Sequence, residues 1–300
     1  MDNAFRRRLE KQGYRFLGEH SAIKTCDWTR KSLIGEGVCY KEKFYGISCH
    51  RCAQISVSVN FCDMNCIYCW REHRNFPFTI IDEPQDILDR IADARKDLVA
   101  GIGGHRNADR KKVKEALNVK HIAISLTGET LYYPKLNELI REISRRGMTS
   151  FVVTNGSRPD ILEKLENPTQ LYLSLDSYNK ELFQKVCRPL SDDMWKKVMK
   201  SLDVLAEKKC KTCIRLTLIR GINMSKPEEY AGLISRGKPD FAEVKAFMLV
   251  GAARERLTID NMPFHDEIKK FAEEICRHCD YSVVDEQEES RVVLCAKKKH

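Results

Sequence analysis

Residues 61–72 read FCDMNCIYCWRE and place Cys62, Cys66 and Cys69 in a C-x3-C-x2-C pattern. One short loop of this kind can direct three thiolates at a single [4Fe–4S] cluster. The fourth iron then has no cysteine ligand and can bind another molecule, unlike an iron in a structural four-cysteine site. A zinc knuckle or three unrelated thiols are the alternatives, although zinc sites usually pair two C-x2-C units. The loop therefore predicts a cluster that takes part in chemistry.

The composition limits the class of protein. The chain has 300 residues, of which 42% are hydrophobic, enough for a large α/β core. Thirteen cysteines in clustered spacings argue for metal binding and against a disulfide framework. We find no run near the roughly 18 apolar residues of a membrane span and no apolar signal-peptide core, so we expect a cytoplasmic protein. The net charge of +9, spread along the chain, favours an acidic partner such as RNA.

From residue 56 onward, short apolar runs alternate with helical patterns. The apolar runs lie near 56–61, 121–127, 150–155, 171–176, 213–219 and 244–250. Helical patterns at 85–100, 135–146, 192–208 and 227–235 lie between them. The alternation predicts βαβ units with a parallel sheet, and six units predict an α/β fold, a partial (β/α)6 TIM-like barrel.

The predicted organisation has two parts. Residues 1–55 form an N-terminal extension that carries cysteines, and residues 56–300 form the barrel with a C-terminal helix (265–277) and a β-patterned tail. Functional residues of such a barrel lie at the carboxyl ends of its strands.

Tyr68 directly precedes the last cysteine of the loop. Together with the cysteine spacing, this resembles the signature of the radical S-adenosylmethionine superfamily, whose enzymes have partial (β/α)6 barrels. The resemblance implies that Cys62, Cys66 and Cys69 hold the cluster and that its open iron binds S-adenosylmethionine. An electron from the cluster then breaks the sulfonium bond and gives a 5′-deoxyadenosyl radical.

Polar residues follow four further predicted strands, in the order the superfamily uses for cofactor binding. The candidates are Gly128, Glu129, Thr154, Asn155, Ser174, Asp176, Arg215 and Asn223. The segment with Gly128 resembles the superfamily's GGE segment, and Arg215 suits the carboxylate of the methionyl group as a bidentate partner. Each pattern alone is ordinary turn chemistry. Their order along the chain supports the assignment.

A second group of cysteines lies upstream, at Cys26, Cys39, Cys49 and Cys52. One interpretation is a zinc site of Cys49, Cys52 and two others. The other is a second iron–sulfur cluster, held either by four cysteines or by three with one iron open to substrate.

The sequence from residue 24 to the C-terminus resembles one protein family. The pieces are CYKEKFYGI (39–47), CHRCAQ (49–54), NCIYCWREHR (65–74), SLTGETLYYP (125–134), EVKAFMLVG (243–251) and LTIDNMP (257–263). They resemble tRNA 4-demethylwyosine synthases of archaeal type. That family builds the tricyclic base from N1-methylguanosine beside the anticodon of phenylalanine tRNA. Pyruvate supplies two carbons and loses its carboxylate carbon.

The family resemblance also implies roles for the upstream residues. Cys26, Cys39 and Cys52 would hold a second [4Fe–4S] cluster whose open iron binds pyruvate, with Cys49 as a surplus thiol. Lys41 would be the amine that forms a Schiff base with pyruvate, since a partly desolvated lysine can supply a free amine. Lys43 is the alternative. The eukaryotic relatives carry an additional flavin domain, so we expect a separate electron donor here, such as a flavodoxin or ferredoxin.

Two segments are candidates for contacts with tRNA. The stretch 101–115 is rich in glycine and then basic, with Arg106, Arg110, Lys111 and Lys112 available for phosphates. Beside the cysteine loop, Trp70, Arg71, His73 and Arg74 suit stacking on an unpaired base. A solvated loop and core packing of Trp70 are the respective alternatives.

Two rival functions remain from sequence alone. One is a different radical S-adenosylmethionine enzyme with an auxiliary cluster. The other is a zinc-stabilised RNA-binding protein without catalysis. For Glu243 and Lys245, on one face of the last parallel strand, a substrate contact and an internal ion pair both stay open. The pairs Cys210–Cys213 and Cys276–Cys279, with Cys187 and Cys295, are expected to be ordinary thiols.

Overall fold

The computed structural model describes residues 1–59, 61–72 and 74–298. Contacts divide the chain into two compact units. Unit 1 consists of Met1–Phe61, Arg74–Val153 and Leu165–Thr169, and unit 2 of Cys62–His73, Thr154–Lys164 and Gln170–His300. The functional boundary predicted after residue 55 divides the chain differently, and it stays a prediction.

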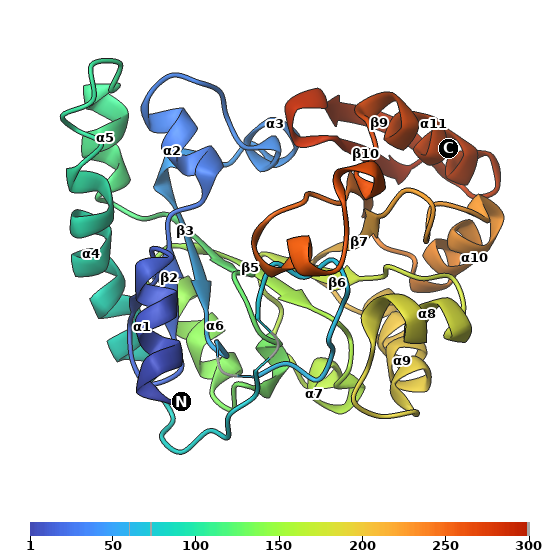
Figure 1. Cartoon of the computed structure of the whole chain (residues 1–300), viewed down its shortest axis with the longest axis horizontal. Coiled ribbons are helices and arrows are strands. Elements are labelled where there is room, and N and C mark those ends of the chain that lie inside the picture. Colours follow the sequence, from blue (N-terminus) through green and yellow to red (C-terminus); the bar gives the residue numbers. More distant parts are fainter. Residues whose placement is uncertain (60, 73, 299–300) are drawn as a thin grey trace. The chain divides into compact units, whose positions relative to one another are not determined.

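Unit 1 contains five neighbouring strands (Figure 1). They are β1 (Arg15–Phe16), β2 (Ala22–Lys24), β3 (Cys52–Ser56), β4 (His121–Ile124) and β5 (Thr149–Thr154). The strands β3, β4 and β5 are parallel, whereas β2 pairs antiparallel with both β1 and β3. The parallel part of the sheet therefore begins at β3, which Cys52 opens.

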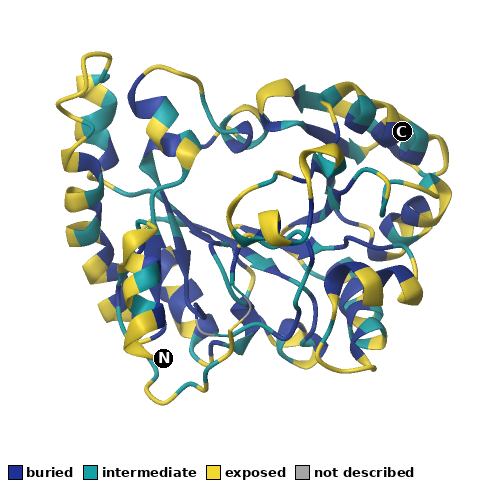
Figure 2. Ribbon diagram, in the orientation of Figure 1, coloured by how far each residue is buried: buried dark blue, intermediate teal, exposed yellow. Residues whose placement is uncertain are grey.

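The helices of unit 1 cover this sheet. They are α1 (Asn3–Lys11), α2 (Asp27–Leu33), α3 (Tyr40–Tyr45), α4 (Pro84–Ala100), α5 (Arg110–Ala116) and α6 (Leu136–Arg145), with the 3-10 turns η1 (Cys49–Arg51) and η2 (Thr130–Tyr132). In α4, Ile87, Leu88, Ile91 and Val99 recur at helical spacing and are buried. The remaining face of the helix is largely exposed (Figure 2).

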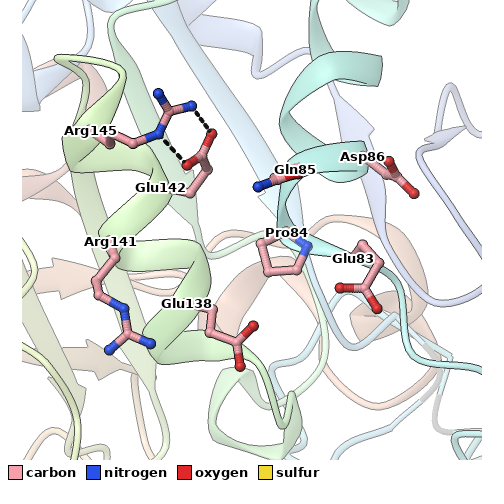
Figure 3. A pocket seen from close by; sticks show the side chains of 8 residues that line it. All are labelled: Glu83, Pro84, Gln85, Asp86, Glu138, Arg141, Glu142 and Arg145. Atoms are coloured by element: carbon pink, nitrogen blue, oxygen red, sulfur yellow. Dashed lines mark hydrogen bonds and ion pairs between the residues drawn. The ribbon is translucent and has the colours of Figure 1, made fainter.

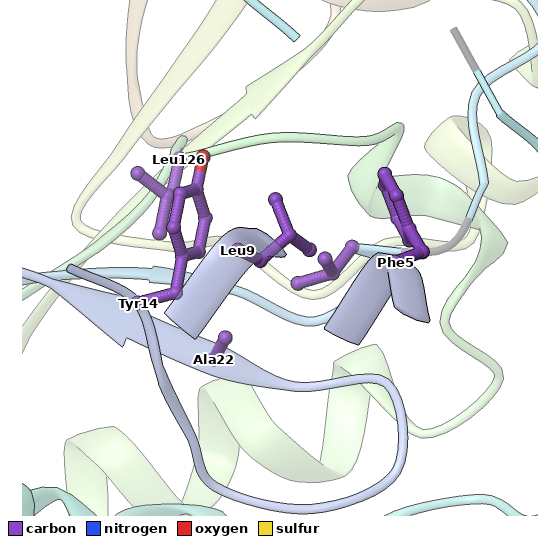
Figure 4. Close-up of a cluster of buried hydrophobic side chains, with 6 residues drawn as sticks. Phe5, Leu9, Tyr14, Ala22 and Leu126 are labelled. Carbon is purple, nitrogen blue, oxygen red and sulfur yellow. The ribbon is translucent and has the colours of Figure 1, made fainter. Parts of the chain in front are cut away.

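The first helix is fixed by an apolar cluster. Asp2 caps α1 by accepting a hydrogen bond of 2.6 Å from the backbone N–H of Phe5. The buried members of the cluster are Phe5, Leu9, Tyr14, Ala22, Val59 and Leu126 (Figure 4). Burial of each large side chain removes apolar surface from water and contributes about 1.5–3 kcal/mol. The cluster thereby joins α1 to β2 and to the segments that follow β3 and β4.

Unit 2 repeats the arrangement of parallel strands with antiparallel neighbours. Its strands are β6 (Gln170–Ser174), β7 (Lys211–Leu218), β8 (Phe241–Ala246), β9 (Tyr281–Gln287) and β10 (Val292–Lys297). The strands β6, β7 and β8 are parallel, β10 pairs antiparallel with β8, and β9 pairs antiparallel with β10.

The helices of unit 2 alternate with these strands. They are α7 (Pro159–Glu163), α8 (Lys180–Cys187), α9 (Met194–Ala206), α10 (Pro227–Gly237) and α11 (His265–Arg277), with the 3-10 turns η3 (Gly251–Glu255), η4 (Ile259–Asn261) and η5 (Glu288–Ser290). Helix α11 packs against β8, β9 and β10, and α9 packs against α7 and α10.

The α/β prediction is confirmed, because three parallel strands in each unit give the six expected and agree with a partial barrel. The first and the last of them were misplaced. The first is Cys52–Ser56, not 56–61, and the last is Phe241–Ala246, not 244–250. Ser56 and Ser58 donate hydrogen bonds of 2.5 and 2.8 Å to the carbonyls of Thr127 and Glu129, and these bonds replace the ladder beyond residue 56.

Among the described residues, no helix is both long and apolar enough to cross a membrane. The cytoplasmic location stays a prediction.

A buried histidine fastens the loop before β2. Only 2% of His20 is exposed. Its Nδ1 donates to the carbonyl of Val57 at 2.7 Å, and its Nε2 accepts from the N–H of Asp82 at 3.0 Å. The Asp82 carboxylate in turn accepts from the N–H groups of Glu19, His20 and Ser21. This arrangement requires neutral imidazole, since Nε2 is an acceptor.

This histidine should make stability depend on pH. Burial lowers the pKa of His20 below its usual 6.5. The unfolded chain therefore binds a proton more readily, and the free energy of unfolding should fall as the pH drops below about 6.5. His20→Gln keeps a donor and an acceptor but cannot titrate. Its free energy of unfolding should therefore fall less than that of the native chain when the pH drops. Denaturant titrations at about pH 7 and about pH 5.5 measure the free energy of unfolding of each protein. If the native chain and His20→Gln lose equal stability between these pH values, His20 is not the group responsible.

Candidate functional site

The predicted cluster loop, residues 62–69, has no helix or strand of its own and is held by backbone hydrogen bonds within unit 2. Its bonds to the end of α8 and the residues after it are Asn65 N to Cys187 O at 3.0 Å, Ile67 N to Val186 O at 2.9 Å, and Leu190 N to Asp63 O at 3.0 Å. The three cysteines are half-buried. The loop is thus positioned by its neighbours and not by regular structure.

Asp176, after β6, connects this loop to the strands. Its side chain is 4% exposed. One carboxylate oxygen accepts from the hydroxyl of Tyr68, and the other accepts from the N–H of Thr217 at 2.6 Å. Burial raises the pKa of Asp176, and the hydrogen bonds from Tyr68 and Thr217 act in the opposite direction. The sequence placed Asp176 at the cofactor, but its bond to the cluster loop was not foreseen.

Asn155, after β5, also contacts the loop. Its Nδ2 donates to Asp63 Oδ1 at 2.9 Å and lies 3.8 Å from Cys62 Sγ. Its Oδ1 accepts from the N–H of Ser157 at 2.9 Å, which fixes the orientation of the amide. Asn155 therefore reaches the first of the three cysteines directly.

A small cavity of about 50 Å³ marks where these groups meet. Its lining includes Met64 and Tyr68 from the loop, together with Asn155, Ser174 and Asp176. Ligand pockets are usually larger than about 300 Å³, so the cavity does not itself accommodate a nucleoside. The structure does bring three predicted cofactor residues together against the cluster loop.

The other predicted cofactor residues of unit 2 make internal contacts. Arg215 Nε donates to Glu243 Oε2 at 3.0 Å, and its guanidinium lies 4.6 Å from the ring centre of Tyr172. Asn223 is fully buried, and its Nδ2 donates to the carbonyls of Asp176 and Thr217 at 2.8 and 2.9 Å. Asn223 thus supports Asp176 from behind. Of the two residues expected on one face of this last parallel strand, Glu243 pairs with Arg215 and Lys245 donates to the carbonyl of Ser290.

Three predicted cofactor residues lie in tight turns. Gly128 has φ +79°, and a Cβ there would lie 1.8 Å from the carbonyl oxygen of Ser58, so only glycine fits. Glu129 is buried and its carboxylate accepts from the N–H of Leu131 at 3.0 Å. Thr154 Oγ1 accepts from the N–H of Gly156 at 3.0 Å.

The upstream cysteines gather around Lys41 in unit 1. Burial raises the pKa values of the Cys26 thiol, the Cys39 thiol (to about 12) and the Cys52 thiol (to about 11), and the Lys41 charge opposes this at all three. One lysine is therefore within electrostatic reach of all three sulfurs. Arg95, which is 1% exposed, donates to two backbone carbonyls and lies near Cys26 and Cys52. Two cations beside three thiols suit an anionic thiolate-bound cluster.

Lys41 and Lys43 are distinguished by the helix they share. Lys41 is only 8% exposed, and its Nζ lies 5.0 Å from the ring centre of Phe151 on β5. Lys43, two residues along α3, points to solvent. The helix therefore presents Lys41, and not Lys43, to the thiols.

Cys49 has different surroundings from the other three upstream cysteines. Its sulfur accepts from the N–H of Cys39 at 3.5 Å, and its own N–H donates to Glu42 Oε2 at 2.8 Å. Burial raises its pKa to about 11, with Glu42 acting in the same direction. A carboxylate neighbour disfavours a thiolate here, which agrees with Cys49 as a surplus thiol.

No three His, Cys, Asp or Glu side chains in the described part of the chain are arranged to hold a single metal ion. A [4Fe–4S] cluster binds each cysteine through a different iron, so its sulfurs are further apart than those around one zinc ion. The finding therefore concerns single-ion sites such as zinc and not a cluster.

The remaining thiols are less isolated than the sequence suggested. A hydrogen bond with Cys187, together with burial, raises the pKa of Cys66. In unit 2, a hydrogen bond with Cys295 lowers the pKa of Cys276, and Cys213 and Cys279 lie nearby. All thirteen cysteines are free thiols. These neighbours come from different elements, so no local spacing could have revealed them.

A groove larger than this cavity lies in unit 1 and is formed by other residues. It has a volume of about 470 Å³ and lies between the start of α4 and α6 (Figure 3). Two of its charges pair with each other: Arg145 donates twice to Glu142 at 2.7 Å. The pKa of Glu142 is lowered to about 2 by its bonds with Arg145 and Arg146. It contains no cysteine.

The candidate RNA-contacting residues differ in their exposure to solvent. Arg106, Arg110 and Lys111 are exposed, and Lys112 is half-buried. Trp70 is 36% exposed, so it is not a core residue, whereas Arg71 is buried. His73 lies outside the described residues.

Comparison with known proteins defines the class first. Residues 56–234 match the family model described as the Radical SAM superfamily, and residues 236–297 match the one described as Wyosine base formation. Membership in this superfamily implies S-adenosylmethionine and a [4Fe–4S] cluster as cofactors.

Similar proteins then narrow the family. The chain is 43% identical to the S-adenosyl-L-methionine-dependent tRNA 4-demethylwyosine synthase of Pyrococcus horikoshii, over 95% of this chain and 86% of that protein. It is 42% identical to the Methanocaldococcus jannaschii protein of the same name, over 95% and 93%. The Xenopus laevis relative is 39% identical, and the match spans 99% of this chain and 41% of that protein.

Two solved structures are also similar. The first, "Structure of TYW1 with a lysine-pyruvate adduct bound", has a TM-score of 0.90 and 40% identity, over 99% of this chain and 96% of that one. The second, "Crystal structure of archaeal TYW1", has a TM-score of 0.83 and 36% identity, over 99% and 96%. The chain therefore belongs to the tRNA 4-demethylwyosine synthase family of the radical S-adenosylmethionine superfamily, and it is an enzyme.

Proposed function

We propose that this chain forms 4-demethylwyosine from N1-methylguanosine beside the anticodon of phenylalanine tRNA, with two carbons from pyruvate. The observation that carries the proposal is the burial of Lys41 within reach of Cys26, Cys39 and Cys52. A generic radical enzyme does not need a desolvated amine beside a second set of thiols. The relatives named tRNA 4-demethylwyosine synthase support the same product.

The cluster loop supplies the radical side of the reaction in this proposal. Cys62, Cys66 and Cys69 would hold a [4Fe–4S] cluster, which together with S-adenosylmethionine provides one-electron chemistry that makes a carbon radical. Asn155 and Asp176 hold the loop through Asp63 and Tyr68, which fixes the direction of the three thiols. Ser174, beside them, is the polar group available for the nucleoside.

The other candidate cofactor residues have supporting roles in this proposal. Arg215 pairs with Glu243 and suits the methionyl carboxylate of the cofactor. Gly128 and Glu129 would present backbone groups to the ammonium, Thr154 shapes the turn that carries Asn155, and Asn223 positions Asp176.

Lys41 supplies the carbon-donor side. Its neutral amine would attack the ketone carbon of pyruvate, and loss of one water gives an imine that holds the two retained carbons. The apolar ring of Phe151 and the burial of Lys41 keep water away from this nitrogen. Cys26, Cys39 and Cys52 would hold a second [4Fe–4S] cluster with an open iron for the pyruvate carboxylate. The electrons would come from a separate donor such as a flavodoxin or ferredoxin.

The lysine assignment predicts a trapped adduct. Borohydride reduction in the presence of labelled pyruvate should attach the label to the native chain and to Lys43→Ala, and at least tenfold less to Lys41→Ala. Peptide mass spectrometry should locate the label at residue 41. Equal labelling of the Lys41→Ala and native chains would contradict the assignment.

Two clusters predict a particular iron content. Replacing Cys62, Cys66 and Cys69 by alanine should remove about half of the iron bound after anaerobic reconstitution, and replacing Cys26, Cys39 and Cys52 should remove the other half. Cys49→Ala should leave the iron content unchanged. A chain in which the second triple retains all its iron would have no auxiliary cluster.

The exposed face of α5 suits the phosphates of tRNA. Arg110, Lys111 and Lys114 are exposed on neighbouring positions of the helix, and among the described residues none of them forms an ion pair. Their charges are therefore available for counterion release on binding RNA.

Removing these charges should weaken binding of tRNA and its salt dependence. Replacing Arg110, Lys111 and Lys114 by glutamine should make the slope of log affinity against log salt less negative by about 2–3. The control triple takes Gln at Arg236, Lys269 and Arg277, whose charges are already paired with Asp203, Glu286 and Glu274. Filter binding over a range of salt concentrations measures both. An unchanged slope in the first triple would exclude α5 from the interface.

A further inference from the structure

The second half of the cluster loop is held by a segment almost two hundred residues away. Arg256 follows η3, and its Nε donates to the carbonyl of Ile67 at 3.0 Å. Its Nη2 donates to the carbonyl of Cys69. One guanidinium therefore bridges two carbonyls of the loop, one on each side of Tyr68, and its planar fork fixes their separation.

The same segment makes a second contact with the loop. The N–H of Ala252 donates to the carbonyl of Trp70 at 2.9 Å. Gly251, with φ +56°, lies so close that a Cβ there would be 2.4 Å from that carbonyl oxygen. Residues 251–256 thus form a clamp on residues 67–70. They lie in the part of the chain that matches the wyosine base formation family.

The clamp also brings a positive charge to the cysteines. Among the described residues Arg256 forms no ion pair, and both of its side-chain hydrogen bonds go to loop carbonyls. Its hydrogen bond with the Cys69 carbonyl places this charge beside one of the three cysteines. A cation beside thiolate ligands favours added negative charge.

We propose that Arg256 is a positioning residue for the radical-generating centre: it fixes the carbonyls on either side of Tyr68 and makes a cluster bound by this loop easier to reduce. The inference rests on the proposed function only in that Cys62, Cys66 and Cys69 hold the cluster. A reduced cluster carries one more negative charge than an oxidised one, and the fixed guanidinium stabilises that state. The family-specific segment would thereby tune the first electron transfer.

The midpoint potential of the cluster tests this proposal. The full chain is reconstituted anaerobically and titrated with a one-electron reductant, and the electron paramagnetic resonance signal that responds to S-adenosylmethionine is followed. Arg256→Gln removes the charge, so at a fixed potential the ratio of reduced to oxidised cluster should fall about tenfold, a shift of 59 mV. Arg256→Lys keeps the charge and should stay closer to the native value. Arg254→Gln is the matched control, because Arg254 is exposed and its hydrogen bond goes to the Leu249 carbonyl in its own segment and not to the cluster loop.

Each outcome bears on one claim. A native potential in fully loaded Arg256→Gln would overturn the proposal, as would an equal shift in Arg254→Gln. Failure of Arg256→Gln to keep iron, with hydrogen exchange of the metal-free chain faster only at residues 67–70, would support the clamp. If Arg256→Gln loses iron but hydrogen exchange at residues 67–70 is unchanged, the proposed role of the clamp is contradicted. A native chain without any signal that responds to S-adenosylmethionine would instead refute the assignment of the three cysteines.

Discussion

The carboxylate of Asp176 is the contact on which the cluster loop most depends. It accepts hydrogen bonds from Tyr68 in the loop and from Thr217 on β7, and Asn223 binds its carbonyl from behind. Three thiols on a loop without regular structure can hold a metal cluster only if the loop has one conformation. Asp176 and Asn155 provide that constraint from the strand ends, and residues 186–190 and Arg256 provide it along the backbone.

A different constraint governs the chemistry around Lys41. A buried ammonium is costly unless anionic groups or an aromatic face compensate for lost hydration. Here the compensation comes from Phe151 and, in the proposed function, from three thiols that would become anionic on binding iron. In that proposal, the burial of Lys41 keeps its amine beside both the second cluster and the pyruvate.

The sequence predicted most of the parallel strands because their apolar runs and the helical patterns between them have distinct periods. It misplaced β3 because the apolar alternation continues to Val59, while the hydroxyls of Ser56 and Ser58 end the ladder earlier. It could also point to Lys41, but not separate it from Lys43. The exposure of each residue on α3 makes that distinction.

The contacts that position the site could not be predicted in this way. Arg256 and Tyr68 are far apart in sequence, and neither Cys187 nor Arg95 belongs to a motif with a recognisable spacing. Such contacts arise from tertiary packing, which local patterns do not encode.

The most direct test of the whole account is the product. The reconstituted enzyme is incubated anaerobically with tRNA containing N1-methylguanosine, S-adenosylmethionine, a reductant and pyruvate labelled in its two retained carbons, and the nucleosides are then analysed by mass spectrometry. The account predicts 4-demethylwyosine carrying both labelled carbons, and none without pyruvate. Cleavage of S-adenosylmethionine with unchanged N1-methylguanosine would contradict it.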